Sequence, residues 1–553
     1  MTEPVPSETP VLIAGGGPVG LSASILLSHF GVSSLLVERH PGTALHPKAR
    51  GINSRTMEVF RQCGVEDAVR AAGLPPGRAR FIIWTRSLAG EELERRVPAR
   101  SSDDAASLSP TANCLCAQDD LEPVLRRFAE RHAPGEVRFS TEIRDVRQDA
   151  GGVTATLVDR ARGGTTRVRA PYLIAADGAR SRIRDGLGIA MQGEAALYRS
   201  VNILFRADLT PWVADRPSAL YFVEQPNLRG TFLTINGVNR WGFLVNGLAA
   251  EDESGAEFTP DQCVTVIRQA AGVPDLEVEI LGILPWVAAA QVAERYQSGR
   301  VFLAGDAAHH MPPTGGFGMN TGIQDVHNLA WKLAAVQRGW GAPALLDSYE
   351  AERLPHGRAT TEQSLRNAAS MGRVASTIGE QAAGGVSRAR PEFLNEQGMI
   401  FGAVYSSAAI VPDGTPLPSV ANPITDYLPV ARPGSRAPHV WLTRAGECCS
   451  TLDLFGAAFV LLAGSRGGAW TAASREVART RAVPLMAYTV GPNADLGDPD
   501  GRWETGYGVA PDGAVLIRPD GHVAWRSRSA VPEPTAALQQ VLAQLLGHAT
   551  LTR

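Results

Sequence analysis

The most constraining feature of the sequence is a glycine turn close to the N-terminus. Residues 11–14 (VLIA) read as a short buried strand, residues 15–20 (GGGPVG) form a GxGxxG turn, and a helical pattern leads into a second strand at 34–37. Glycines at these places permit a tight turn and close approach of the backbone to a pyrophosphate, and the helix start offers free amides. Glu38, which ends the second strand, suits a hydrogen bond to a ribose diol. The pattern predicts a Rossmann-like α/β dinucleotide-binding domain; a structural glycine turn beside a surface glutamate is the alternative.

Two more carboxylates follow buried-strand patterns far from this turn. Asp177-Gly178 comes directly after YLIAA, and Gly305-Asp306 comes directly after VFLA. Open α/β sheets bind ligands outside the carboxyl ends of their strands, although a DG pair alone is also consistent with a plain turn. After Asp306, prolines and glycines hold residues 312–318 extended, and Asn320 is predicted to cap the next helix. That helix start would present backbone amides to a negative group.

Length and composition limit the classes of function. A chain of 553 residues predicts two to four domains, and 44% hydrophobic with 20% charged residues is ordinary for a soluble globular protein. A net charge of -3 gives no reason to expect nucleic acid or an anionic membrane as a partner. The six cysteines show no zinc spacing, the N-terminus does not read as a signal peptide, and no apolar stretch reaches membrane-span length. These features predict a cytoplasmic protein.

The remaining chain divides by pattern. Residues 190–286 show long alternating strands separated by turn residues, which predicts an antiparallel sheet, and residues 77–102 are strand-like and rich in arginine. A linker dotted with proline and glycine precedes a small α/β region at 437–553. That region has no CxxC, and the adjacent pair Cys448-Cys449 does not predict a redox function.

The three separated motifs, in this order, resemble those of the FAD-dependent aromatic hydroxylases, the single-component flavoprotein monooxygenases. Stretches 433–442, 450–456 and 513–526 resemble the thioredoxin-like tail of the longer members, found in phenol hydroxylases and in hydroxylases that tailor aromatic polyketides. The resemblance implies a discontinuous FAD-binding domain (1–76, 103–189 and 287–400) and an inserted substrate-binding β-sheet domain (77–102 and 190–286). A linker (401–436) and a thioredoxin-like C-terminal domain (437–553) would follow.

The resemblance also implies which residues contact the cofactor. The GxGxxG motif and its acid would bind the ADP half of FAD, the DG motif would lie near the pyrophosphate, and the GD motif would bind ribitol. Pro313 would lie beside the reacting face of the flavin. The full set implied is Gly15, Gly17, Pro18, Val19, Gly20, Glu38, Arg39, Lys48, Gln118, Leu121, Asp177, Gly178, Gly305, Asp306, Pro313, Gly316, Gly318, Met319 and Asn320.

One position departs from the family pattern. Lys48 stands where the family usually has an arginine, and lysine keeps the charge without the planar fork. Arg50 or Arg55 is therefore a second candidate for the phosphate contact.

The implied reaction is a monooxygenation. In the family NADPH or NADH reduces FAD, O2 adds to the flavin, and a flavin C4a-hydroperoxide hydroxylates an electron-rich ring; the cofactor carries the chemistry and the protein orients and shields. We expect a polycyclic aromatic polyketide as substrate, in a monomer or homodimer. No metal is expected, because the neighbours His309 and His310 point apart on an extended chain. The alternatives are a phenol-type hydroxylase of a one-ring substrate, a Baeyer–Villiger variant, and a binding protein that carries no flavin.

The substrate is expected between the flavin and the 190–286 sheet. Aromatic residues of that sheet are candidate contacts or core residues, and alternation puts only about half of them on the pocket face. Tyr221 is the first choice, because a phenol can orient a substrate hydroxyl or carbonyl. Arg366 and Arg373, on the helix after the flavin domain, are candidates to offset phenolate charge, with a solvated helix face as the alternative. The other aromatic candidates are Phe222, Phe232, Trp241 and Phe243.

Overall fold

A six-stranded, mainly parallel sheet lies at the centre of the computed structural model, which describes residues 5–98, 107–131, 135–248, 258–371, 392 and 395–548. Five strands are parallel and the edge strand β17 is antiparallel. Strands β1, β2, β11 and β18 are buried throughout, because helices and the antiparallel strands at 141–170 both pack against the sheet. The order is β17 (Gln297–Ser298), β18 (Val301–Leu303), β11 (Tyr172–Ala175), β1 (Val11–Ala14), β2 (Ser34–Val37) and β7 (Gly135–Arg138).

Helices from both halves of the chain pack beside this sheet. Helix α1 (Pro18–His29) connects β1 to β2 and contacts α5 (Gln118–Arg131) and α9 (Phe317–Gln337). Helix α9 is buried along most of its length, and its buried residues include polar and charged side chains such as Asp325, Asn328 and Lys332. The predicted α/β fold class is confirmed.

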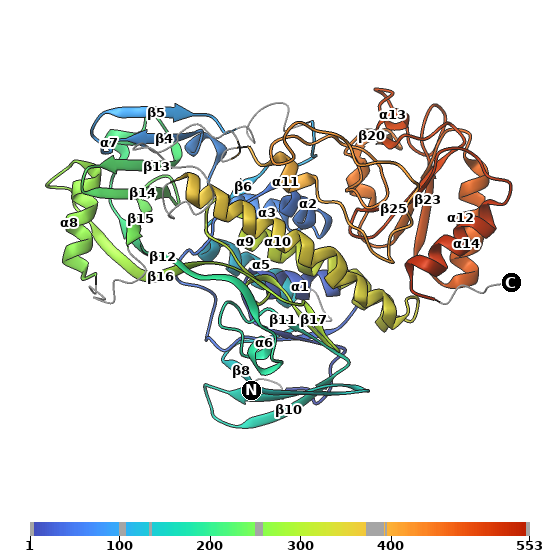
Figure 1. The fold of residues 1–553 in the computed structure, drawn as a ribbon, viewed down its shortest axis with the longest axis horizontal. Coiled ribbons are helices and arrows are strands. Elements are labelled where there is room, and N and C mark those ends of the chain that lie inside the picture. Colours follow the sequence, from blue (N-terminus) through green and yellow to red (C-terminus); the bar gives the residue numbers. More distant parts are fainter. Residues whose placement is uncertain are drawn as a thin grey trace.

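A large eight-stranded sheet lies beside the central sheet, at the left of Figure 1. Helix α8 (Pro260–Ala271) packs on one face of this sheet through Cys263, Ile267 and Ala270. The order is β19 (His309–His310), β16 (Glu279–Ala293), β12 (Met191–Arg206), β15 (Arg240–Leu248), β14 (Leu228–Thr234), β13 (Ser218–Gln225), β4 (Phe81–Thr85) and β5 (Glu92–Arg96).

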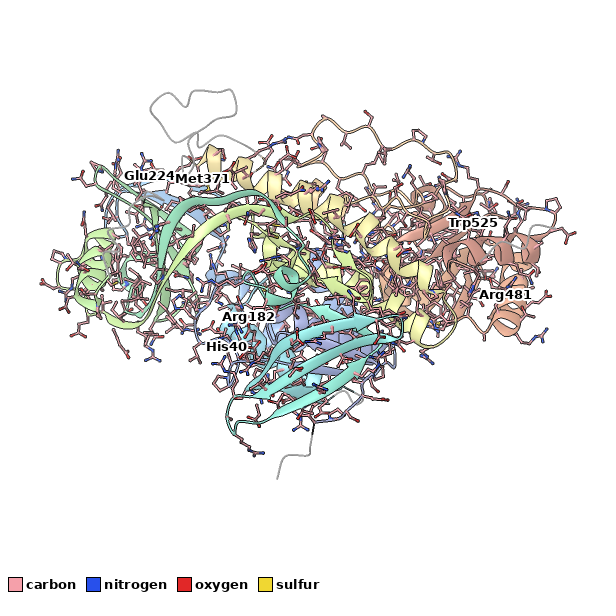
Figure 2. All side chains as sticks on the ribbon, turned by 60° about the horizontal axis from the view of Figure 1, so that its bottom comes forward. His40, Arg182, Glu224, Met371, Arg481 and Trp525 are labelled. Carbon is pink, nitrogen blue, oxygen red and sulfur yellow. The ribbon has the colours of Figure 1, made fainter. Side chains whose placement is uncertain are left out.

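Smaller elements complete the first two thirds of the chain. Figure 2 shows a three-stranded antiparallel sheet, β8 (Thr141–Asp149), β9 (Gly152–Asp159) and β10 (Thr165–Ala170), with His40 and Arg182 labelled above it. A two-residue ribbon pairs β3 (Gly51–Ile52) with β6 (Cys114–Leu115). The short helices are α2 (Ser54–Gln62), α3 (Glu66–Ala72), α6 (Arg182–Gly186) and α7 (Thr210–Val213).

The long helix α10 (Asp347–Ser370) crosses the molecule from the neighbourhood of the C-terminal part toward the large sheet (Figure 1). The short helix α11 (Gln397–Phe401) follows, and the C-terminal part is built on a four-stranded sheet. In that sheet β22 and β23 are parallel, and β24 and β25 form an antiparallel hairpin. The order is β23 (Leu485–Thr489), β22 (Phe459–Ala463), β24 (Ala514–Ile517) and β25 (Val523–Ser527).

Helices α12 (Gly468–Arg481) and α14 (Pro534–Leu545) pack together beside this sheet, and α13 (Trp503–Tyr507) precedes the hairpin. A second hairpin pairs β20 (Trp441–Arg444) with β21 (Glu447–Ser450). All six cysteines are free thiols in the structure, Cys448 and Cys449 of this hairpin included.

Candidate active site

Four adjacent parallel strands end at the same edge of the central sheet. The register pairs Ala14 with Val37 and with Ala175, and Ala175 with Leu303. The motifs that follow these strand ends, at 15–20, 38, 177–178 and 305–306, therefore meet at one edge. The structure thus brings together residues that the sequence separates by almost 300 positions.

The glycine turn after β1 leaves no room for side chains. A Cβ on Gly15, whose φ is +104°, would lie 2.2 Å from the Ala176 carbonyl oxygen. A Cβ on Gly20 would lie 1.9 Å from the carbonyl oxygen of Gly15. Helix α1 begins after Gly17, with no side-chain cap and no acidic residue in its first turn. Its first amides thus face the sheet edge, the arrangement that binds phosphate.

Glu38 is held at this edge by backbone amides. One carboxylate oxygen accepts a hydrogen bond from Gly16 N at 2.7 Å, and the other accepts from His40 N at 2.8 Å. The Nδ1 atom of His40 lies 2.7 Å from the same carboxylate. Arg39 is exposed. The carboxylate is therefore fixed beside the glycine turn.

Asp177 carries a buried oxygen atom without a hydrogen-bond partner. Its Oδ2 atom accepts a long bond of 3.5 Å from Ile183 N, whereas its Oδ1 atom has none. Burial raises the pKa of this carboxyl group. An orphaned buried acceptor costs free energy, so this atom is suited to a donor from a bound molecule.

The GD turn after β18 is hydrogen-bonded to a second carboxylate, that of Asp325. Asp325 of α9 accepts a hydrogen bond from Gly305 N at 3.2 Å, and its Oδ2 lies 2.9 Å from His309 Nε2. Its other oxygen accepts from Arg353 Nε at 2.8 Å. Burial would raise the pKa of Asp325, but Arg353 and His309 lower it to about 2. Asp306 itself is exposed at the edge.

The N-terminus of α9 is a second helix start whose first backbone amides have no side-chain cap. Such an uncapped helix start is called an open helix mouth below. Gly316 precedes the helix with φ +68°, and the helix has neither a side-chain cap nor an acid in its first turn. The prediction that Asn320 caps this helix is wrong, because Asn320 lies inside its first turns. The side-chain amide of Asn320 donates to the carbonyls of Gly51 and Gly316, and its oxygen accepts from Asn53 N. Asn320 thereby ties α9 to the ribbon before α2, while Pro313 and Gly316 are exposed.

The alternative phosphate-binding arginines are engaged elsewhere. Arg50 donates to the carbonyls of Thr234 and Ala219 on the large sheet, at 2.7 and 2.6 Å. Arg55 is buried and pairs with Glu58. Lys48 is exposed and acts electrostatically on Glu122, which lies near the glycine turn. Of the three cations considered, Lys48 is therefore the one with a free head group at this edge.

The predicted contacts at the start of α5 have internal roles. Gln118 donates from its side-chain amide to Glu122 at 2.7 Å. The side chain of Leu121 is fully buried in the core. Glu122 also accepts from Ala44 N at 2.6 Å, which ties α5 to the loop that carries Lys48. A contact from Leu121 to a bound molecule would have to come from its backbone.

Tyr221 does not face the central domain, and this prediction is corrected. Its ring packs in the core beneath α8, together with Phe232, Trp241 and Phe243. Its hydroxyl accepts from Ser218 N at 3.0 Å and donates to the Arg216 carbonyl at 2.9 Å, so it closes a turn. Of the five aromatic candidates, Phe222 lies on the opposite face of the sheet.

That opposite face is apolar with a few polar groups. Leu204 and Leu233 pack with Ala117 of the central domain, and Phe222 stacks on Trp84 at 5.1 Å. Met371, just past α10, packs against the Trp84–Phe222 pair. This face is therefore the candidate wall of a substrate site.

Two polar residues of this wall were missed by sequence reasoning. Asn202 donates to the Pro47 carbonyl at 3.1 Å, and its side-chain oxygen is buried without a partner. His46 lies against β16 near Gly282, and its Nε2 is likewise buried and unpaired. Burial and the charge of Lys48 lower the pKa of His46, and they outweigh the neighbouring Asn202 side chain, which acts to raise it. Neither residue lies in a motif, and only the pairing of β12 with its neighbours brings them together.

The two arginines predicted to offset phenolate charge, Arg366 and Arg373, are not placed at this wall by the described structure. Arg366 lies on the exposed side of α10 and pairs with Glu362 one turn earlier, so it is not directed at the wall. Arg373 lies outside the described residues. Among the described residues, no group of three or more His, Cys, Asp or Glu side chains is arranged to hold a metal ion. Over the same ranges, no helix is both long and apolar enough to cross a bilayer.

The sheet order, the glycine turn and the two open helix mouths define a dinucleotide-binding α/β protein. The FAD binding domain model matches residues 8–364, and the aromatic-ring hydroxylase C-terminal model matches residues 430–549. The chain therefore belongs to the FAD-dependent aromatic-ring hydroxylases. The glycine cradle, the unpaired Asp177 oxygen and the open helix mouths fit FAD, which is the cofactor of this family.

The chain is similar over almost its full length to known monooxygenases. Tetracenomycin A2 monooxygenase-dioxygenase of Streptomyces glaucescens is 41% identical over 98% of both chains. The 4-methyl-5-nitrocatechol 5-monooxygenase of a Burkholderia species is 40% identical over 99% of this chain and 100% of its own. The crystal structure of aklavinone-11 hydroxylase with FAD and aklavinone superposes with a TM-score of 0.86 at 37% identity, covering 99% and 100%.

Proposed function

We propose that this protein hydroxylates a polycyclic aromatic polyketide, with FAD as cofactor, NADPH or NADH as reductant and O2 as cosubstrate. The observation that carries the proposal is the likeness over the full chain to an enzyme whose structure holds FAD and aklavinone. The 41% identity to a tetracenomycin A2 monooxygenase-dioxygenase supports the same substrate class.

The wall of the large sheet supports a broad, flat substrate. Leu204, Leu233, Trp84 and Phe222 place apolar side chains on one face of the sheet, and the neighbouring side chains of His46 and Asn202 add buried polar atoms. Ligand sites are mostly apolar with a few placed polar groups. We propose that these two residues orient a hydroxyl or carbonyl group of the substrate.

The assignment of the cofactor contacts follows the geometry of the sheet edge. We propose that the turn 15–20 and the α1 amides bind the pyrophosphate, that Glu38 binds the ribose, and that Asp306 binds ribitol. The α9 mouth, at Gly316 to Asn320, would place backbone amides against the pyrimidine edge, where they stabilise negative charge.

When bound, the FAD supplies hydride acceptance from NAD(P)H and the activation of O2. The chain's own residues would bind and orient the ring to be hydroxylated, and the apolar wall would exclude water from it. We also propose the domain division and a cytoplasmic location, where NAD(P)H is available, with the protein as a monomer or a homodimer.

A second candidate rests on the 40% identity to a monooxygenase of 4-methyl-5-nitrocatechol, a one-ring substrate. Anaerobic stopped-flow reduction of the purified protein by NADPH separates the two candidates. Anthracyclinones, angucyclinones and simple phenols are added in turn, and the loss of flavin absorbance is followed. Acceleration by the polycyclic compounds is expected.

Acceleration by one-ring phenols alone would refute the polyketide proposal. Product masses after turnover in 18O2 then report on the reaction. A labelled ring hydroxyl is expected, whereas a labelled lactone or ester would show Baeyer–Villiger insertion. A protein that binds no flavin would refute the enzyme assignment altogether.

A further inference from the structure

The tip of the β24–β25 hairpin in the C-terminal part is buried against the flavin-binding part. This segment, residues 518–522 (RPDGH), is called the hairpin tip below. Arg518 and Asp520 are at most 1% exposed. From α2, Arg55 donates to the Asp520 carbonyl at 2.8 Å, and Gln62 donates to the Pro519 carbonyl at 2.8 Å. The tip thus inserts into the other part of the molecule.

The hairpin tip completes a network of buried charges. Arg518 donates two hydrogen bonds to Glu352 of α10, at 2.6 and 2.9 Å, and also pairs with Asp520. Lys332 of α9 donates to Glu352 at 2.8 Å. Asp520 accepts from the Trp331 indole at 3.2 Å. Two cations and two carboxylates balance, and buried charges require such pairing because an unpaired one is costly.

A second network connects the hairpin tip to the GD turn. The ring of Tyr405 stacks on His522 of the tip, with 4.1 Å between ring centroids. The Tyr405 hydroxyl accepts from Arg353 Nη1 at 2.9 Å, and Arg353 in turn pairs with Asp325. Asp325 holds Gly305 N and His309. One chain of contacts therefore runs from His522 to the turn that carries Asp306.

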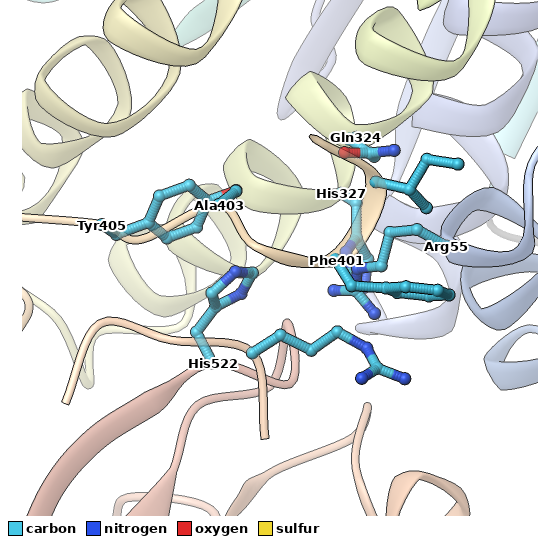
Figure 3. Close-up of a pocket in the computed structure, with 9 residues that line it drawn as sticks. Arg55, Gln324, His327, Phe401, Ala403, Tyr405 and His522 are labelled. Carbon is cyan, nitrogen blue, oxygen red and sulfur yellow. The ribbon is translucent and has the colours of Figure 1, made fainter. Parts of the chain in front are cut away.

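Figure 3 shows the junction between the two networks. Tyr405 and His522 lie at one side of a void of about 10 Å³, and Arg55, His327 and Phe401 are among the other residues that line it. This volume leaves room for about one water molecule between these side chains. The stacked rings of Tyr405 and His522 are in direct contact there, and close-packed side chains transmit displacements because they have little room to absorb them.

Helix α9 carries both networks on one face. Thr321, Asp325, Asn328 and Lys332 recur at intervals of three and four residues, which places them along one side of the helix. Thr321 O accepts from Arg353 at 3.1 Å, and Asn328 donates to Glu352 at 2.6 Å. The same helix begins at the Gly316 mouth. The orientation of the mouth is therefore linked to the hairpin tip through a single helix.

We propose that the hairpin tip is a positioning element of the flavin site, with Tyr405 and Asp520 as positioning residues. The tip fixes α9 and α10, and these helices hold the Asp325–Arg353 pair that orients the GD turn. The proposal gives the C-terminal part a role in cofactor binding without redox chemistry. It rests on the proposed FAD contacts of Asp306 and the α9 mouth.

Two variants and a matched control test this proposal. Tyr405→Phe removes the hydroxyl that accepts from Arg353 and keeps the ring that stacks on His522. Asp520→Asn removes one carboxylate charge from the buried network that the hairpin tip forms with Glu352 and Lys332. The control, Asp413→Asn, removes a half-buried charge that pairs with Arg526 of β25, in the same hairpin. The dissociation constant of FAD is measured by flavin fluorescence, well below the melting temperature of each protein.

Both test variants are expected to weaken FAD binding about ten-fold, within the usual range of coupling between sites. They are also expected to speed amide hydrogen exchange at residues 305–309 in the FAD-free protein. Asp413→Asn is expected to lower the melting temperature while its FAD dissociation constant stays within about two-fold. A lower melting temperature alone does not change the affinity of folded molecules.

Wild-type FAD affinity and wild-type exchange at 305–309 in Tyr405→Phe would overturn the proposal, even if Asp520→Asn fails to fold. An equal loss of affinity in Asp413→Asn would also overturn it, because any loss of stability would then suffice. If the wild-type protein binds no FAD, the proposed function fails, while the exchange experiment still tests the link between tip and GD turn.

Discussion

The crossing of α1 and α9 offers a sharp test of how the cofactor turn is packed. A Cβ on Gly322 of α9 would lie 2.6 Å from Val19 Cγ2 and 2.8 Å from the Cα atom of Gly305. One of these neighbours is backbone, so Gly322→Ala must displace either the helix or the GD turn. Gly318, on the same helix, has open space around its Cβ position. Gly318→Ala is therefore a matched comparison.

The magnitude follows from two terms. Alanine in place of glycine inside a helix stabilises by about 0.5–1 kcal/mol; this gain applies at Gly322, and it is the upper bound at Gly318, which lies in the first turn of α9. Overpacking a well-packed site costs about 1–3 kcal/mol, and this cost applies at Gly322 alone. The difference between the variants in the free energy of unfolding, measured by urea denaturation of the FAD-free proteins, is therefore expected to be about 1–3 kcal/mol.

The same displacement predicts a weaker cofactor complex for Gly322→Ala, because the GD turn lies against the new methyl group. The dissociation constant of FAD, measured by titration of each variant, is expected to be larger for Gly322→Ala than for Gly318→Ala. Equal stabilities for the two alanine variants, or a more stable Gly322→Ala, would refute the assigned close packing of α1, α9 and the GD turn.

Three further outcomes are expected. Glu38→Ala should weaken FAD binding by about 1–3 kcal/mol, the scale of a lost charged hydrogen bond, and unchanged affinity in a fluorescence titration would move the ribose site elsewhere. Tyr221→Phe should lower the free energy of unfolding by about 1 kcal/mol because its hydroxyl closes a turn, with hydroxylation unchanged; lost turnover at normal stability would restore it as a substrate contact. Because the pKa of Asp325 is depressed to about 2, its stabilisation is present above its unfolded pKa and is lost as the pH falls through the folded value. The difference in free energy of unfolding between the wild-type protein and Asp325→Asn should therefore shrink between about pH 4 and 2. A difference that stays constant in urea denaturation would contradict this.

The features that sequence predicts well here are local. The turn 15–20 lies between a strand and a helix that are continuous in sequence, so its glycines could be interpreted directly. The acid at 38 and the DG and GD pairs each follow a buried strand. Their meeting at one edge follows from parallel pairing alone.

The failures share a physical cause. Alternation along β13 shows that Tyr221 and Phe222 face opposite sides, but not which side α8 covers. Asn320 is a residue type that often caps helices, yet the helix already begins at Phe317, directly after Gly316. Asp325 was missed because its partner Arg353 lies on another helix. Such partners depend on tertiary packing, which no local pattern encodes.

The hairpin tip also bears on how the chain reaches its folded state during synthesis. Glu352 lies in a helix that is complete by residue 370, yet Arg518, which donates to both of its oxygens, is made about 150 residues later. Domains usually fold in order as they leave the ribosome. Until the hairpin is made, Glu352 lacks these two hydrogen bonds and the surface that the tip covers stays open. A chain that ends before the hairpin is therefore expected to aggregate or be degraded rather than to form a shorter enzyme.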